Sequence, residues 1–548
     1  AIANLVAAPL RWTIAYGALS LIYLVGSRMI ARLFLNRRNP HREQVIIYGA
    51  GEGGARLAAA LFSGDDYLPV AMVDDNLHLH GKRVNGMEVF PPSRLQDVIE
   101  STGASGVLLA IPSASRHRRR QILEQLSEFP VHVRTIPEIR DLVSGKSRVD
   151  DLSEVDVKDI LGRDEVPPNL DLLHASVAGK NVMVTGAGGS IGSELCRQIV
   201  KLGPSRLVCF DISEPALYEI GRELNSLLAQ ENVKCDVVSL LGSAHHEKRV
   251  TEALQAFEIQ TVYHAAAYKH VPIVEHNLFE GIHNNVFGTL HTARAAVESG
   301  VETFVLISTD KAVNPTNVMG ATKRLAEQVL QAYNSRAENT RFCMVRFGNV
   351  LESSGSVVPL FREQIRNGGP VTVTHRDIIR YFMTIPEAAQ LVIQASSMAK
   401  GGDVFVLDMG NPVRIQDLAR RMINLMGLTI RNDENPDGDI EIQYIGLRPA
   451  EKLYEELLIG SNVTGTEHPR IMRADEESLS FEELDELIGE LKSASANFDY
   501  AHARTILQRA VAEYAPTNGI DDLVWLSKNG TLGDADDTKV VDFPAKQV

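Results

Sequence analysis

The sequence predicts an α/β fold with two doubly wound parallel sheets in tandem, preceded by a transmembrane helix and followed by a smaller α/β part. Two glycine-rich turns, at residues 49–54 and 186–192, each lie between an apolar strand and an amphipathic helix. Each turn opens an alternation of strands and helices, the pattern of a parallel sheet covered on both faces. The length of 548 residues exceeds one hydrophobic core and fits about three structural units.

Composition narrows the classes of function. The chain is 44% hydrophobic and 23% charged, with a formal net charge of −15, which argues against nucleic acid as a partner. The cysteines show neither paired nor metal-ligand spacing, so we expect reduced core residues and no metal site. They are Cys196, Cys209, Cys235 and Cys343.

The amino-terminal segment, residues 1–43, contains the predicted transmembrane helix. Residues 10–30 (LRWTIAYGALSLIYLVGSRMI) form an apolar run of about the 20 residues that a bilayer-crossing helix needs. Arg11 and Arg28 shorten its uncharged part, so a buried or in-plane helix is the alternative. Several arginines follow the run, and the positive-inside rule then places everything downstream on the cytoplasmic side of the inner membrane.

The first glycine turn opens a small predicted domain over residues 44–145. Gly49, Gly51 and Gly54 fit the pattern GxGxxG, and Asp74 ends the next strand, where a ribose-binding acid is expected. This Rossmann-like domain either binds a nucleotide or serves packing and assembly. Residues 146–178 are polar and contain two adjacent prolines, which indicates a linker.

The second turn opens the candidate catalytic domain, residues 179–515. Glycines at its tight positions let the backbone approach a diphosphate at the helix amino terminus. Asp211 ends the next strand, and its carboxylate would accept hydrogen bonds from the ribose hydroxyls and repel a 2′-phosphate. NAD is therefore the predicted cofactor. The predicted cofactor-binding residues are Gly186, Gly189, Ser190, Ile191, Gly192, Asp211, His264, Ala265, Ala266 and Lys323.

Several ordered blocks carry a resemblance to a known family. The match spans about residues 179–473, and within it seven stretches follow one another from residue 264 to residue 458: HAAAYKHVPIVE, NNVFGT, STDKAVNPTNVMGATKR, VRFGNV, SSGSVVPLF, RYFMTIPEA and LRPAEKLYEELL. Together they resemble the large membrane-anchored UDP-N-acetylglucosamine 4,6-dehydratases of bacterial polysaccharide and glycan synthesis, within the extended short-chain dehydrogenase/reductase superfamily.

The resemblance implies a reaction and roles for its residues. NAD takes a hydride from C4 of the sugar, water is lost across C5 and C6, and the hydride returns to C6 to give a 4-keto-6-deoxy sugar. Asp310 is implied as the acid at the C6 hydroxyl and Lys311 as the base at C5. A basic lysine must be neutral part of the time, and positive charge from Lys323 and the nicotinamide would lower its pKa. The large membrane forms of the family generally retain the C5 configuration, so we expect retention.

Met319 departs from the superfamily pattern. Most relatives have a tyrosine four residues before Lys323, where it takes the C4 hydroxyl proton, and a thioether cannot do this. We hypothesise that Thr309 and Asp310 relay this proton instead, while Lys323 holds the nicotinamide ribose.

The resemblance also implies a nucleotide-sugar cleft in the smaller carboxyl-terminal part. Its predicted residues are Lys269, His270, Asn349, Ser354, Gly355, Ser356, Val357, Arg380, Arg414, Arg448 and Glu451. Three positions depart from the family: Ser243 replaces an aspartate near the adenine, and Glu352 and Ala450 replace glycines.

Two alternatives remain open: a nucleotide-sugar epimerase, which needs no acid and base at C5 and C6, and a non-catalytic dinucleotide sensor. A homo-oligomer is expected, and residues 516–548 are expected to form a mobile tail.

Overall fold

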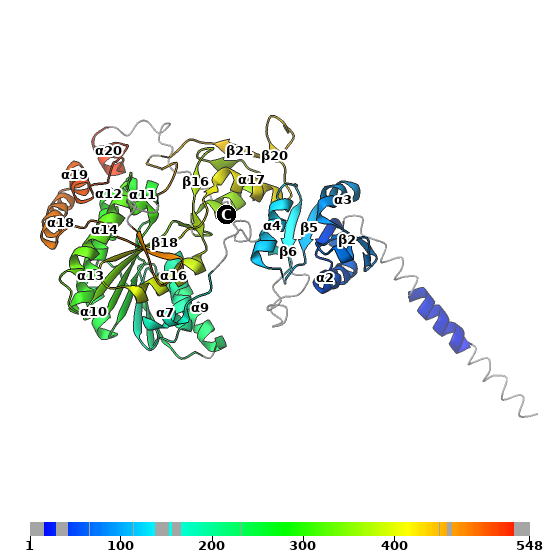
Figure 1. Cartoon of the computed structure of the whole chain (residues 1–548), viewed down its shortest axis with the longest axis horizontal. Coiled ribbons are helices and arrows are strands. Elements are labelled where there is room, and N and C mark those ends of the chain that lie inside the picture. Colours follow the sequence, from blue (N-terminus) through cyan, green and yellow to red (C-terminus); the bar gives the residue numbers. More distant parts are fainter. Residues whose placement is uncertain are drawn as a thin grey trace, which may run out of the picture. The chain divides into compact units, whose positions relative to one another are not determined.

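The computed structural model describes residues 16–28, 42–64, 66–112, 114–136, 153–155, 166–231, 233–353, 355–448, 450–456 and 463–530. The chain divides into two compact units, drawn in Figure 1. Unit 1 comprises residues 1–156 with 423–429, and unit 2 comprises residues 157–422 with 430–548. Each unit contains one of the two predicted glycine turns.

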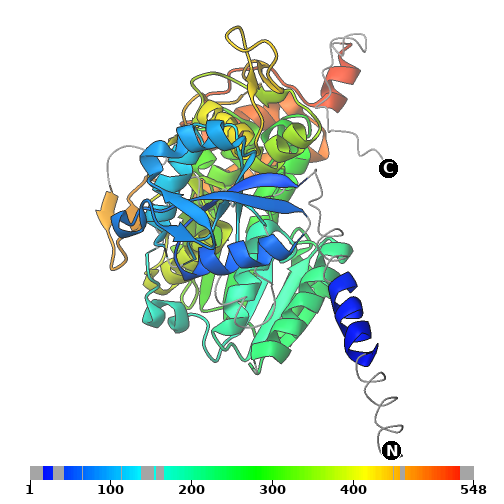
Figure 2. The ribbon, with the colours of Figure 1, turned by 90° about the vertical axis from the view of Figure 1, so that its right-hand side faces the viewer.

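Unit 1 is the first predicted Rossmann-like fold. Its sheet has the order β3-β4-β2-β1-β5-β6-β7, parallel from β4 to β6 and antiparallel at both edges. Figure 2 shows helices on either side of these strands. The elements are β1 (Glu43–Tyr48), α2 (Glu52–Ser63), β2 (Tyr67–Val73), β3 (Arg83–Val84), β4 (Met87–Phe90), α3 (Leu95–Thr102), β5 (Gly106–Leu109), α4 (Arg116–Leu126), β6 (His132–Thr135) and β7 (Ser153–Glu154).

Unit 2 is organised around a nine-stranded sheet of order β10-β9-β8-β11-β12-β13-β18-β23-β22. The first seven strands are parallel and the last two antiparallel. All six strands predicted from the sequence occur in it. They are β8 (Asn181–Thr185), β9 (Arg206–Asp211), β10 (Asp236–Leu241), β11 (Thr261–His264), β12 (Thr303–Ile307) and β13 (Arg341–Arg346); β18 (Asp403–Leu407), β22 (Val463–Gly465) and β23 (Ile471–Ala474) complete the sheet.

Alternate residues of these strands pack on opposite faces of the sheet. On β8, Val182 and Val184 share one apolar cluster with α7, α8, α9 and α16, whereas Met183 belongs to the cluster with α10, α13 and α14. Because both faces are covered, the strands are apolar at nearly every position. The helices are α7 (Leu170–Ala175), α8 (Ser190–Lys201), α9 (Glu214–Glu231), α10 (Glu247–Ala256), α13 (Gly288–Glu298), α14 (Val318–Asn334) and α16 (Ile385–Met398).

A third apolar cluster joins α14 to a carboxyl-terminal helical layer. Helices α18 (Phe481–Ala496) and α19 (Tyr500–Ala510) contribute to it together with α11 (Val271–Glu275) and α12 (Leu278–Gly281). Figure 1 shows these helices beside α14. As a result, α14 is buried along most of its length.

Short strands and helices form the smaller part of unit 2 that the sequence predicts. Three small sheets pair β14 with β17, β15 with β21 and β20, and β16 with β19. The elements are β14 (Asn349–Val350), α15 (Val357–Arg366), β15 (Val371–Val373), β16 (Ile379–Arg380), β17 (Phe382–Met383), β19 (Val413–Arg414), α17 (Ile415–Leu425), β20 (Ile430–Arg431) and β21 (Ile440–Tyr444).

The structure describes part of the predicted amino-terminal span and part of the predicted carboxyl-terminal tail. Residues 16–28 are helical, and the remainder of the predicted span lies outside the described residues. None of the described helices combines the length and apolar character that crossing a membrane requires. In the tail, α20 (Leu523–Lys528) is held against unit 2, since the Leu523 amide donates to the His276 carbonyl at 3.1 Å. Residues 531–548 lie outside the described residues.

Candidate active site

The glycine turn of unit 2 has the close approaches that a dinucleotide site requires. Gly186 has φ +66°, and a Cβ there would lie 2.7 Å from the Ala266 nitrogen. A Cβ on Gly192 would lie 2.0 Å from the Gly186 carbonyl oxygen. The turn therefore packs tightly against the end of β11 and leaves the amino terminus of α8 uncovered by side chains from these positions, as phosphate binding needs.

Asp211 is oriented by the backbone at the end of β9. Its carboxylate accepts hydrogen bonds from the amides of Gly188 and Ser213, both at 2.8 Å. Two large apolar side chains next to it are exposed, Ile212 by 68% and Leu241 by 49%. Sequence reasoning missed both; for Ile212, the available signal was an apolar residue directly after a strand-ending acid. Such side chains suit the faces of an adenine ring.

The His264 side chain supports the turn from inside the fold. Its ring is 1% exposed, with Nδ1 at 2.8 Å from the Thr185 hydroxyl and Nε2 at 3.3 Å from the Thr289 hydroxyl. Burial, followed by the positive charge of Lys323, lowers the pKa of His264 to about 3. The ring is thus neutral and engaged within the fold, and the backbone of Ala265 and Ala266 lies against Gly186.

Lys323 and Met319 lie one turn apart on α14. The Lys323 amine donates to the Ile307 carbonyl at 2.7 Å, and burial lowers its pKa to about 8 against the opposing effect of Glu327. Met319 is 2% exposed and belongs to the apolar cluster that α14 shares with α18 and α19. The thioether is therefore part of the core.

Asp310 and Lys311 directly follow β12, at the carboxyl edge of the sheet where doubly wound folds bind ligands. Asp310 is 1% exposed, and its Oδ1 accepts hydrogen bonds from the Thr309 hydroxyl at 2.8 Å and the Lys311 amine at 3.0 Å. Its Oδ2 is buried and has no hydrogen-bond partner within the described part of the chain. A Cβ on Gly348 would lie 3.1 Å from Oδ2, so a glycine leaves the space beside this oxygen open.

The protonation of Lys311 differs from the sequence-based prediction. Burial acts to lower its pKa, but the carboxylates of Asp310 and Glu455 outweigh that effect and raise it. The expected lowering of the Lys311 pKa by Lys323 is therefore wrong for this structure, because nearby negative charge dominates. The Lys311 side chain is therefore an ammonium that donates a hydrogen bond to Asp310 Oδ1.

The predicted sugar-side residues converge on this pair in part. The Lys311 amine also donates to Asn349 Oδ1 at 3.3 Å. A Cβ on Gly355, which has φ +70°, would lie 2.8 Å from His270 Cε1, so the loop before α15 packs on the His270 ring. Partial burial lowers the pKa of Lys269, and the charge of Lys311 adds to that effect. Ser356 and Val357 begin α15, and Ser354 lies outside the described residues.

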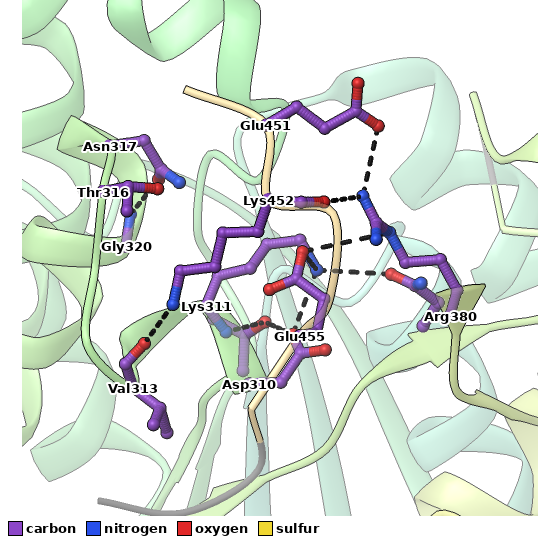
Figure 3. Close-up of polar contacts among 12 residues, drawn as sticks. Asp310, Lys311, Val313, Thr316, Asn317, Gly320, Arg380, Glu451, Lys452 and Glu455 are labelled. Atoms are coloured by element: carbon purple, nitrogen blue, oxygen red, sulfur yellow. Dashed lines mark hydrogen bonds and ion pairs between the residues drawn. The ribbon is translucent and has the colours of Figure 1, made fainter. Parts of the chain in front are cut away.

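Residues 450–456, here called the strap, lie over the Asp310–Lys311 pair (Figure 3). Arg380 on β16 anchors them: its guanidinium donates to Glu451 Oε1 at 3.1 Å and to the carbonyls of Lys452 and Leu453 at 2.8 and 3.3 Å. The Lys452 amine donates to the Val313 carbonyl at 3.1 Å. Arg380 and Glu451, both predicted to bind substrate, thus hold the strap in place.

Glu455 is the strap residue that the sequence did not single out. Its side chain is 5% exposed, and Oε1 lies 3.8 Å from the Lys311 amine and 3.9 Å from Arg380 Nε. Its Oε2 is buried with no hydrogen-bond partner among the described residues. The signal was weak, because Glu455 is one of three glutamates within EKLYEE.

The other two predicted arginines lie at the surface. Arg414 is exposed on β19, next to Ile379 of β16 in the antiparallel pair. Arg448 is also exposed, and its backbone amide donates to Glu451 Oε2 at 3.1 Å. The structure does not bring their guanidinium groups into contact with Asp310 or Lys311 among its described contacts.

In unit 1, Asp74 makes the same kind of backbone contacts as Asp211 makes in unit 2. Asp74 accepts hydrogen bonds from the amides of Ala50 at 2.6 Å and Asn76 at 2.8 Å, as Asp211 does from its own turn. A Cβ on Gly54 would lie 1.8 Å from the Gly49 carbonyl oxygen. The two units therefore share one local architecture for the first turn of a Rossmann-like fold.

Comparisons with known proteins match both units. Residues 182–476 match the family model of the polysaccharide biosynthesis proteins, and residues 10–137 match that of a CoA-binding domain. The capsular polysaccharide biosynthesis protein CapD of Staphylococcus aureus is 42% identical over 80% of this chain and 73% of its own length.

Two further relatives cover about half of the chain. A UDP-glucose 4-epimerase of Rickettsia rickettsii is 33% identical over 51% of this chain and 77% of its own length. An inverting UDP-N-acetylglucosamine 4,6-dehydratase of Campylobacter jejuni is 29% identical over 51% of this chain and 78% of its own length.

Proposed function

The chain belongs to the polysaccharide biosynthesis protein family, and from that membership we propose that it is an NAD-dependent 4,6-dehydratase of UDP-N-acetylglucosamine. The observation that carries this proposal is the buried Asp310–Lys311 pair at the carboxyl end of β12, with Thr309 bonded to the same carboxylate. An acid and a base side by side are what the loss of water across C5 and C6 requires.

The residues of the unit 2 turn fit NAD. The tight glycines admit a diphosphate, the Asp211 carboxylate suits unsubstituted ribose hydroxyls, and Ile212 and Leu241 offer apolar surface for the adenine. We propose that Lys323 holds the nicotinamide ribose. When bound, NAD supplies the oxidation of C4 and the later reduction at C6.

The elimination is the work of the protein side chains. Thr309 passes the C4 hydroxyl proton to the Asp310 carboxylate, which requires no phenol and is consistent with a methionine at position 319. A C4 ketone makes the C5 proton acidic, and Lys311 removes that proton. Asp310 then gives its newly gained proton to the C6 hydroxyl, which leaves as water.

One incubation tests the proposed function. With UDP-N-acetylglucosamine in heavy water, a dehydratase yields a product lighter by one water with deuterium at C5, read by mass spectrometry and NMR. The NMR spectrum also reports whether the C5 configuration is retained, as we expect. An epimerase would conserve the mass, and a sensor would return the substrate unchanged.

The relay from the C4 hydroxyl has its own test. We expect Asp310→Asn to slow single-turnover reduction of bound NAD by about 100-fold, the usual range for a lost proton acceptor. Unchanged reduction in this variant would remove Asp310 from the relay. Asp377→Asn, an exposed change after β15, serves as the control and should react as the wild type does.

An epimerase is the second candidate, favoured by the Rickettsia relative. Reversal of configuration at C4 needs neither a C6 acid nor a C5 base. The Asp310–Lys311 pair would then have no role, which makes dehydration the better account.

We also propose that residues 10–30 attach the protein to the inner membrane, with the catalytic unit facing the cytoplasm and the product feeding a surface polysaccharide or glycan. Supporting this, helical residues 16–28 expose large apolar side chains, among them Leu19, Leu21 and Ile22 at 66–70%. Fractionation of cells into membrane and supernatant tests the attachment, and recovery in the supernatant would contradict it.

A further inference from the structure

In the reaction proposed above, Lys311 acts as a base, but a protonated lysine cannot remove a proton. A base at C5 needs a free electron pair on nitrogen, whereas Lys311 lies between two carboxylates as an ammonium. Before it can remove the C5 proton, it must give up one of its own. The acceptor must lie close to the amine and must not already have another task in the reaction.

Among the described residues, three groups form a hydrogen bond or an ion pair with the Lys311 amine. Asp310 Oδ1 is nearest, at 3.0 Å, but the Asp310 carboxylate receives the proton of the C4 hydroxyl and cannot hold a second. Asn349 Oδ1, at 3.3 Å, belongs to an amide that does not take up protons near neutral pH. Glu455 Oε1, at 3.8 Å, belongs to a carboxylate without a role so far.

We propose that Glu455 accepts the proton of the Lys311 ammonium and thereby supplies the neutral amine that acts at C5. The inference rests on the dehydratase function proposed above. It places a further proton-carrying group on the strap, well separated in sequence from the Asp310–Lys311 pair that it serves.

The geometry of the Glu455 carboxylate fits an acceptor. It is 5% exposed, so water does not compete freely for it, and its contacts of 3.8 and 3.9 Å are ion pairs longer than hydrogen bonds. Oε2 is buried without a hydrogen-bond partner in the described residues, so this oxygen is available to take up a proton. Arg380 and Lys452 anchor the strap just before this residue, and Arg380 also pairs with Glu455 itself at 3.9 Å, which fixes where the acceptor lies.

The protons balance over the cycle. At rest, Asp310 and Glu455 are ionised and Lys311 is protonated. The C4 hydroxyl proton moves to Asp310, and the Lys311 proton moves to Glu455. The C5 proton then moves to Lys311 while the C6 oxygen leaves with the Asp310 proton as water. After reduction at C6, Lys311 returns a proton to C5 and recovers its own from Glu455, so each group ends as it began.

The test compares Glu455→Gln with Glu455→Asp and with Glu456→Gln as a matched control. Glu456 is the exposed neighbour on the strap and contacts Asn314, away from the Lys311 amine. Two readouts are taken between pH 6 and 9: incorporation of solvent deuterium at C5, and initial C4 oxidation through the absorbance of the reduced cofactor.

We expect Glu455→Gln to lower C5 deuterium incorporation by about 100-fold or more across this pH range. Initial C4 oxidation should stay within about two-fold of the wild type, which also shows that the variant folds and binds its ligands. Glu455→Asp should recover at least about a tenth of the exchange, and Glu456→Gln should match the wild type.

A purely electrostatic role predicts the opposite sign. Removing a carboxylate would make Lys311 easier to deprotonate, so the pH profile of exchange would move to lower pH without loss of its maximum. That shift, or unchanged exchange, would overturn the role of Glu455. Failure of the wild type to release a dehydrated product would instead overturn the proposed function, so the two failures are distinguishable.

Discussion

Lys323 combines a functional position with a cost in stability. Its amine is buried, and burial lowers its pKa to about 8 from 10.5. Between these two values the native state binds fewer protons than the unfolded chain, so this group makes stability rise with pH across that window. At pH 7 the full penalty is present, on the order of 3 kcal/mol.

We therefore expect Lys323→Met to stabilise unit 2 by about 2 kcal/mol at pH 7, after allowance for the unpaired Ile307 carbonyl that it leaves. The gain should shrink as the pH rises from 8 to 10, and affinity for NAD should fall. Urea unfolding followed by hydrogen exchange measures the first effect, and calorimetric titration with NAD the second. Lys201→Met, at an exposed site on α8, is the control. A gain that is equal at pH 7 and 10 would contradict this account.

At the scale of elements, two departures from the family pattern lie where glycine is favoured. Glu352 has φ 58° and Ala450 has φ 60°, in the left-handed region that costs a non-glycine residue roughly 1–2 kcal/mol. Ala450 begins the strap, and its carbonyl accepts a hydrogen bond from the Thr316 hydroxyl at 3.3 Å. At both positions the backbone thus adopts the left-handed conformation that a glycine would adopt freely, and this strains the non-glycine residue.

Ala450→Gly should consequently stabilise unit 2 by about 0.5 kcal/mol, because relief of the left-handed strain exceeds the added flexibility of the unfolded chain. The same exchange at Ala229, exposed in the last turn of α9, should destabilise by roughly 0.5 kcal/mol. Urea unfolding of both variants checks the opposite signs. A loss of stability at both positions would show that Ala450 is not strained.

The elements that sequence predicts well are those with a local signal. The apolar runs of β8 to β13, the glycine turn at Gly186 and the strand-ending Asp211 are each readable from a few neighbouring residues. Glu455 is not, because its role depends on a strap that folds back over β12 from a distant part of the sequence. The pKa of Lys311 could not be predicted for the same reason. Asp310 is its neighbour in the sequence, but the second carboxylate that raises the pKa, Glu455, approaches it only in the folded chain.

At the scale of the whole molecule, one buried ionic network ties the catalytic elements of unit 2 together. Arg346 on β13 donates to both oxygens of Glu327 on α14, at 2.7 and 2.6 Å, and to Glu476 beyond β23. Arg324 bridges the same two glutamates at 3.2 and 3.1 Å. Ser308, adjacent to Thr309, donates to Glu327 at 2.6 Å. The network therefore links the last sheet strands to the residues beside the proposed proton relay.

The stability that this network contributes depends on pH through the buried carboxylate of Glu327. Desolvation acts to raise the pKa of Glu327, but Arg346, Arg324 and Ser308 outweigh it and lower the pKa to about 2. Stability from this carboxylate is thus present above about pH 4.5 and is lost as the pH falls towards 2. Removing one charge from the network leaves the opposite charge buried without full compensation.

We expect Glu476→Gln to destabilise unit 2 by about 3 kcal/mol, since Glu476 is 2% exposed and faces both arginines. Unit 1 contains none of these residues, so hydrogen exchange of the full chain should accelerate in β12, β13 and α14 while β1 and β5 keep their protection. Glu477→Gln is the matched control, because Arg324 contacts only the backbone carbonyl of Glu477, which the exchange preserves. Equal acceleration in both units would show instead that the two units unfold together and that the network does not act on unit 2 alone.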